Sequence, residues 1–147
     1  MRTIIQKVIR ASICVEKKYF VKINKGLLCY VAFKKDDKIV DILRTANKIS
    51  KLKIFDSQKS VNDVNGEILI VSQFTLYAEI KKGSKPSFSK AANRQTAKLL
   101  YERFLSEFNR VNPGLKVKSG LFGEDMKIES VNDGPFTLCY DTDIYNS

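Results

Sequence analysis

The sequence predicts one α/β or α+β domain over residues 1–147, with mixed β-sheets packed against two long helices. Several short segments are rich in β-branched residues, as strands are, and two longer segments place apolar residues at helical spacing. No linker, repeat or low-complexity tract divides the chain. A chain of this length is about one domain and buries roughly 68–70% of its unfolded surface, so it can form a core without disulfides or metal.

The first half of the chain is predicted to contain three strands and one helix. β-Branched residues predict strands at 3–9 and 11–15, and the continuous apolar run at 27–33 is typical of a strand covered on both faces. The aspartate pair at 36–37 can cap a helix, and apolar residues at helical spacing extend that helix over 38–50.

The second half begins with the strongest predicted strand, 67–74. A basic loop at 81–86 leads to a second helix, which we expect to begin near Ser87 or Ser89 and to end near Val111, because a proline and a glycine follow. Three further strands are predicted at 115–118, 126–131 and 136–141, with glycine-bearing turns at 119–123 and 132–135.

The composition excludes several kinds of catalysis. The chain has no histidine, which excludes Ser-His-Asp and Cys-His catalysis, histidine-bound zinc and imidazole as a general base. Its three cysteines, Cys14, Cys29 and Cys139, stand far apart among apolar residues, so we expect buried structural thiols and no thiolate zinc site. We expect neither a metal nor a cofactor.

The charge balance indicates the kind of partner. Lys and Arg number 26 against 16 Asp and Glu, a net charge of +10. This excess favours a polyanion such as nucleic acid, although a charged surface kept for solubility has the same composition. No apolar run approaches the ~20 residues that span a bilayer, and the first residues lack the pattern of a signal peptide, so we expect a cytoplasmic location and no membrane partner.

Two short motifs carry candidate chemistry. Ser72-Gln73-Phe74-Thr75 ends the central strand, where hydroxyls, an amide and backbone N–H groups reach the sheet edge at which ligands tend to bind. A strand that simply reaches solvent would have the same composition. Asn132-Asp133-Gly134-Pro135-Phe136-Thr137 lies between two strands, and a plain tight turn is the alternative there. A Gly-Pro bond can be cis, but the sequence does not indicate the isomer.

Together these motifs, about 60 residues apart, make the chain resemble the D-aminoacyl-tRNA deacylase family from end to end. Shared segments include Ile5-Gln6, Ala11-Ser12, Gly26-Leu27-Leu28, Val71 to Leu76, Lys82-Gly83, Lys85 to Phe88, Phe122-Gly123 with Met126, and Asn132 to Pro135 with Thr137. The resemblance implies the family's fold, an ester hydrolase and chiral proofreading of tRNA in translation. Its substrates would be D-aminoacyl-tRNA and glycyl-tRNA mischarged on tRNA-Ala.

The resemblance also implies a homodimer in which Gly134 and Pro135 of each chain enter the partner's pocket beside residues 72–75. Their carbonyl groups would accept from the substrate's ammonium, and the loop would leave no room for an L side chain, a filter by exclusion. Asn132 and Lys7 would belong to the substrate-binding residues, and the residue at position 7 would help to hold this loop. The family has arginine where this chain has Lys7, which keeps the charge but loses the planar fork of donors. Either Lys7 reaches the same carbonyls or the loop is held differently.

Roles for the catalytic edge follow from the same resemblance. Backbone N–H groups around Gln73, Phe74 and Thr75 would form an oxyanion hole, and Ser72 would orient the substrate. Because no histidine can activate Thr75, we favour attack by water or help from the terminal ribose hydroxyl over a covalent intermediate.

Residues outside the two motifs are assigned to the pocket wall or to the tRNA part of the substrate. Phe88 would stack on the terminal adenine, with a hydrophobic staple for the next helix as its alternative. Met126 would form a pocket wall or belong to the core. The lysines of the basic loop, Lys81, Lys82 and Lys85, would hold acceptor-stem phosphates or be only a solvated surface.

Three other functions remain open on the sequence. One is a non-catalytic tRNA-binding module of the same fold, another is a relative that acts on L-amino acids mischarged to tRNA, and the last is a structural dimer.

Overall fold

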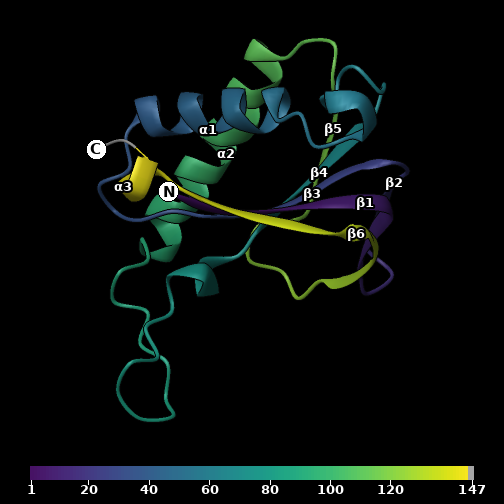
Figure 1. Cartoon of the computed structure of the whole chain (residues 1–147). Coiled ribbons are helices and arrows are strands. Elements are labelled where there is room, and N and C mark those ends of the chain that lie inside the picture. Colours follow the sequence, from purple (N-terminus) through teal and green to yellow (C-terminus); the bar gives the residue numbers. More distant parts are fainter. Residues whose placement is uncertain (146–147) are drawn as a thin grey trace.

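A computed structural model describes residues 1–145, which form one mixed sheet with helices on it (Figure 1). The predicted fold class is confirmed. The strands are β1 (Arg2–Val15), β2 (Tyr19–Ile23), β3 (Gly26–Ala32), β4 (Glu67–Ser72), β5 (Lys116–Ser119) and β6 (Lys127–Asp141). The helices are α1 (Ile39–Lys51), α2 (Arg94–Val111) and α3 (Thr142–Tyr145), with short 3-10 helices η1 (Asp56–Gln58) and η2 (Phe74–Tyr77).

The sheet is organised around β1, whose first half pairs with β3 along one edge and with β6 along the other, both antiparallel. Ala11 pairs with Ile23 and Val8 with Gly26, so β2 and β3 follow β1 in one continuous register. β4 and β5 extend the sheet with parallel pairing. The carboxyl end of β4, which carries the Ser72 motif, therefore lies next to the end of β3 inside the sheet.

Two hydrophobic clusters cover the two faces of this sheet. The helices α1 and α2 bury one face, where Phe104 and Phe108 pack against Leu27 and other strand residues. The opposite face holds a second cluster that includes Leu28, and the neighbours Leu27 and Leu28 point to opposite faces as strand residues must. The expectation that residues 27–33 are covered on both faces is confirmed.

The structure corrects several strand boundaries. β1 is one strand where two were predicted, because Arg10 keeps its pairing with Val131 on β6. β2 was not predicted, since its short sequence has no clear alternation. Residues 132–135 are not a turn between two strands: β6 runs through them with a local change of register.

Helix starts also differ from the prediction. Neither aspartate of the pair at 36–37 caps α1: the helix begins after Lys38, whose N–H donates to Asp41 at 2.9 Å, and Asp37 instead accepts from the Lys34 N–H at 2.9 Å. α2 begins at Arg94 rather than near Ser87 or Ser89, because the Asn93 side chain accepts from the Thr96 N–H at 2.8 Å.

Of the cysteines, only Cys29 is buried, so the expectation is wrong for Cys14 and Cys139, which lie on outward-facing strand positions. No helix within residues 1–145 is long and apolar enough to cross a membrane.

Candidate active site

A cavity of about 770 Å³ opens where β3 and β4 end, beneath the start of α2. It brings together five of the residues singled out from the sequence: Ser72, Gln73, Phe74, Phe88 and Met126 all line it. They come from β4, from η2, from the segment before α2 and from the segment before β6.

The motif at residues 72–75 forms a tight turn in which β4 passes into η2. The Gln73 N–H donates to the Val31 carbonyl at 2.8 Å, so it is not available to a substrate. The Gln73 carbonyl accepts from the Leu76 N–H at 3.2 Å, which closes the first turn of η2. This pattern leaves the N–H groups of Phe74 and Thr75 without a partner inside the turn, as at the start of any helix. Two of the three expected oxyanion donors therefore remain.

The Thr75 side chain is exposed and does not line the cavity itself, although Phe74 beside it does. Its hydroxyl oxygen accepts a hydrogen bond from the Gln73 side-chain amide. Within residues 1–145 the structure gives this hydroxyl no basic partner, so its geometry agrees with a polar orienting group better than with a nucleophile.

An exposed aromatic pair stands at the cavity. The rings of Phe74 and Phe88 lie 5.0 Å apart in an edge-to-face arrangement, and the two residues remain 54% and 40% exposed. Because α2 begins only at Arg94, Phe88 stands six residues before the helix, and the staple alternative is wrong for it. An apolar pair so open to solvent can hold a planar ligand.

Met126 serves both of the roles that the sequence left open. It lines the cavity, and it packs against the second hydrophobic cluster. A Cβ atom at Gly120 would lie 2.6 Å from the Met126 sulfur, so the absence of a side chain at position 120 makes room for this wall.

The Gly134-Pro135 segment lies on β6 as an outward bulge, and its peptide bond is cis. Gln6 pairs with Thr137 and Val8 with Asn132, so one β1 residue stands opposite four on β6. Gly134 has φ of +143°, and a Cβ atom there would meet the Phe136 nitrogen at 2.7 Å, so only glycine fits.

Asn132 and Lys7 hold this bulge. The Asn132 side-chain amide donates to the carbonyl groups of Lys7, at 2.8 Å, and Phe136, at 3.1 Å, and thus clamps the bulge at both ends. The Lys7 side chain is 12% exposed, and its ammonium lies 3.6 Å from the Asp133 carboxylate and 3.7 Å from the Asp56 carboxylate. Of the two alternatives for Lys7, the structure agrees with the second: the loop is held by an amide clamp and an ion pair.

Within one chain the two motifs do not meet. Lys7, Asn132, Gly134 and Pro135 do not line the cavity that holds the other five residues. Gly134 and Pro135 are exposed on a different part of the sheet, along β6.

Sequence reasoning missed several residues around the cavity. Arg94, Glu124 and Asp125 line it and bring charge to an otherwise apolar wall. Arg94 is the first residue of α2, directly after the cap Asn93. The Asn-x-x-Thr spacing could have predicted this cap and with it the position of Arg94. Arg2 was also missed: its guanidinium donates to the Leu76 carbonyl of η2 at 2.7 Å, a contact for which the sequence carries no signal. Within residues 1–145 no group of acidic or cysteine side chains is arranged to hold a metal ion.

Comparison with solved structures establishes the class of fold. The structure of a probable eukaryotic D-amino acid tRNA deacylase superposes with a TM-score of 0.83 at 21% identity, over 95% of this chain and 97% of that one. A c-Myc DNA unwinding element binding protein superposes with a TM-score of 0.88 at 34% identity, over 96% and 98% of the two chains. The domain is thus an α+β domain with the fold of these proteins.

Sequence comparison then identifies the family. D-aminoacyl-tRNA deacylases of Thermosipho africanus and Flavobacterium psychrophilum are 46% and 43% identical, each over 97% of this chain and 97% of its own. The family model described as D-Tyr-tRNA(Tyr) deacylase matches residues 4–141. The chain belongs to this family of hydrolases.

Proposed function

We propose that the chain hydrolyses the ester bond of D-aminoacyl-tRNA, releasing the free D-amino acid and tRNA. The observation that carries the proposal is the turn at residues 72–75. It presents two backbone N–H groups at the edge of a cavity with an exposed aromatic pair, in a chain that has no histidine. The kinship with D-aminoacyl-tRNA deacylases supports the same reaction.

The backbone supplies the chemistry in this proposal. The N–H groups of Phe74 and Thr75 stabilise the oxyanion that forms when water, or the neighbouring ribose hydroxyl of the tRNA, attacks the ester carbonyl. A single such donor contributes about 3–4 kcal/mol of transition-state stabilisation in well-studied hydrolases. Ser72 and the Gln73-Thr75 hydrogen bond orient the aminoacyl group, and Met126 forms the wall behind it.

A homodimer completes the site in this proposal. Gly134 and Pro135 are exposed and clamped by Asn132, yet they lie outside their own chain's cavity. A second copy can bring them to residues 72–75, where their carbonyl groups receive the substrate's ammonium and exclude an L side chain. Glycine has no side chain to exclude, so glycyl-tRNA mischarged on tRNA-Ala is a substrate too.

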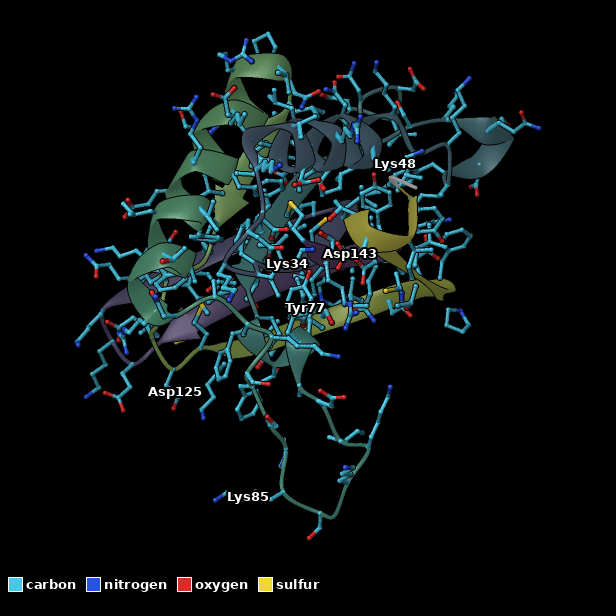
Figure 2. The ribbon with its side chains drawn as sticks, turned by 90° about the vertical axis from the view of Figure 1, so that its left-hand side faces the viewer. Lys34, Lys48, Tyr77, Lys85, Asp125 and Asp143 are labelled. Atoms are coloured by element: carbon cyan, nitrogen blue, oxygen red, sulfur yellow. The ribbon has the colours of Figure 1, made fainter. Side chains whose placement is uncertain are left out.

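The tRNA part of the substrate fits the surface beside the cavity. Phe88 stacks on the terminal adenine, and the exposed loop with Lys81, Lys82 and Lys85 holds acceptor-stem phosphates. Figure 2 shows Lys85 near the tip of this loop, which projects away from the body of the protein. Such a substrate places the enzyme in the cytoplasm.

The first experiment compares release from D- and L-tyrosyl-tRNA by the parent protein and by a Pro135→Ala variant. We expect the parent to cleave the D ester far faster and the variant to lose much of that preference. Equal rates on the two enantiomers in the parent would contradict the chirality claim. Binding of tRNA without cleavage of either ester would show a non-catalytic module.

A second experiment tests the shared site. Thr75→Ala and Pro135→Ala proteins are unfolded together and refolded as a mixture, so that mixed dimers form. If each loop serves the partner's cavity, a mixed dimer contains one site with both elements intact. The mixture then recovers the rate on D-tyrosyl-tRNA that Thr75→Ala lowers and the D-over-L preference that Pro135→Ala lowers. Activity no higher than the mean of the two single variants contradicts the shared site.

A further inference from the structure

A basic groove runs along the outer side of α1, on a part of the surface that the candidate active site does not use. The groove has a volume of about 610 Å³ and is lined by the cations Arg44, Lys48, Lys51 and Lys53. Leu43, Leu52 and Tyr140 are among its apolar lining, and none of the acidic side chains within residues 1–145 lines it. We call this surface the α1 groove.

The α1 groove continues toward β6. A neighbouring hollow of about 340 Å³ shares Lys48, Leu52 and Tyr140 with it and ends at Tyr145. The rings of Tyr140 and Tyr145 are stacked, with centroids 5.3 Å apart and planes at 10°. The groove therefore combines a row of cations with an aromatic platform, and Tyr145 remains largely exposed.

Some lysines elsewhere on the surface are paired with carboxylates: Lys98 with Glu102, Lys118 with Glu67 and Lys34 with Asp143. Within residues 1–145, neither Lys48 nor Lys51 makes an ion pair. Two aspartates offset positive charge, and both lie at the ends of the row. Asp41 is one turn from Arg44 on α1, and Asp63 interacts electrostatically with Lys53.

We propose that the α1 groove binds the phosphate backbone of tRNA at a place remote from the aminoacylated 3′ end. Adjacent unpaired cations release counterions when they meet phosphates, which is the main source of affinity for nucleic acid. The Tyr140-Tyr145 platform offers a face on which a base or ribose can rest. A second copy of this chain fits the groove poorly, because one row of cations would face another.

The position of the groove favours a large folded RNA. Figures 1 and 2 both show α1 and the loop with Lys85 at opposite ends of the molecule, and in Figure 2 Lys48 lies at the end away from Lys85. None of the groove residues lines the cavity. This inference rests on the proposed function for the identity of the RNA, and it adds a second contact area that helps to select tRNA over a short aminoacyl ester.

The test compares a Lys48→Glu/Lys51→Glu variant with a Lys17→Glu/Lys18→Glu control, which changes the net charge equally in the exposed turn between β1 and β2. The probe is full-length tRNA without an attached amino acid, and its dissociation constant is measured at several salt concentrations. We expect the groove variant to bind tRNA at least tenfold more weakly. We also expect the slope of the logarithm of the binding constant against the logarithm of the salt concentration to become shallower by about two, one for each lost phosphate contact. We expect the control to change much less.

Several results would overturn the proposal. Equal weakening in both variants would mean a general charge effect, and no weakening in the groove variant would mean that RNA does not bind there. A changed oligomeric state in the groove variant would assign the groove to a second copy. Displacement of tRNA by polyglutamate as readily as by RNA would assign it to an acidic protein.

A small substrate separates this inference from the proposed function. Hydrolysis of a D-tyrosyl ester of adenosine requires the cavity but cannot reach the α1 groove, so we expect the parent and the groove variant to cleave it equally. If the parent protein cleaves neither this ester nor D-tyrosyl-tRNA, the proposed function is contradicted. The comparison of tRNA binding still decides whether RNA binds in the α1 groove.

Discussion

Replacement of Arg2 should lower catalytic turnover, because Arg2 fastens η2 to the sheet. Its guanidinium donates to the Leu76 carbonyl at 2.7 Å and to the Asp141 carboxylate at 2.7 Å, and it lies 4.8 Å above the Tyr77 ring. Leu76 and Tyr77 belong to the same short helix as Phe74 and Thr75. Figure 2 shows Tyr77 below Lys34 and Asp143.

The energetic effect can be worked from these contacts. Arg2→Ala loses a charged hydrogen bond to Leu76, for about 1.5–3 kcal/mol, and the contact with Tyr77, for about 0.5–1 kcal/mol. It also strips the guanidinium from Asp141, which is 3% exposed, but solvent screens this loss because the Arg2 side chain is 34% exposed. We expect a total loss of about 2–4 kcal/mol in the free energy of unfolding.

The kinetic effect follows from a displaced turn. A shift of about 1 Å in catalytic groups can cost on the order of 100-fold in rate, so we expect kcat on D-tyrosyl-tRNA to fall about 10- to 100-fold with KM little changed. Arg2→Lys should recover only part of the rate, because an ammonium lacks the fork that reaches Leu76 and Asp141 together. Arg10→Ala, at an exposed position on the same strand, is the matched control.

Stability is measured by urea denaturation, and activity is measured at a temperature where every variant is folded. Arg2→Ala with reduced stability but the parent's kcat would refute the reasoning, since Arg2 would then stabilise the fold without positioning η2. Unchanged stability would refute the estimate of the contact energies.

Three further outcomes are expected. Asn132→Ala removes both amide contacts of the clamp and should cost about 2 kcal/mol, seen as a Tm lower by about 4–8 °C, with reduced D-over-L preference; an unchanged Tm would contradict the clamp. The pKa of Glu67 lies below its ordinary value of 4.5, because its carboxylate accepts from the Asn24 N–H at 2.7 Å and also pairs with Lys118. Glu67 therefore stabilises the fold above pH 4.5, and this stabilisation is lost as the pH falls through the lower pKa of the folded state. Glu67→Gln should therefore destabilise at pH 7 but not at strongly acidic pH, as denaturation at both pH values will show, and an equal difference at both would count against this linkage. Burial raises the pKa of the Cys29 thiol, so a thiol reagent should modify Cys14 and Cys139 in the folded protein and Cys29 only after unfolding; rapid labelling of all three would contradict its burial.

The motif at residues 72–75 could be predicted from sequence because it is local, whereas Phe88 and Met126 were assigned through the family resemblance. The turn at residues 72–75 is a contiguous strand end, and Phe88 and Met126 stand in segments of their own that reach the same cavity. The start of α2 was misplaced by several residues, because serine is a good cap in general and the Asn93 cap became clear only with its hydrogen bond to Thr96. Arg2 escaped notice because its partners Leu76 and Asp141 are far away along the chain.

The sequence by itself determined the fold class, the absence of histidine chemistry and the two motifs, since each depends on residue type, periodicity or short spacing. Tertiary structure alone decided how the Gly134-Pro135 segment is presented. Its bulge exists because β6 shifts register against β1, and the clamp that holds it joins Asn132 to the Lys7 carbonyl at the other end of the chain. Strand register and contacts of this kind depend on which distant surfaces are buried together, and no local pattern specifies them. The α1 groove has the same origin, since Tyr140 meets the lysines of α1 only when β6 lies alongside that helix.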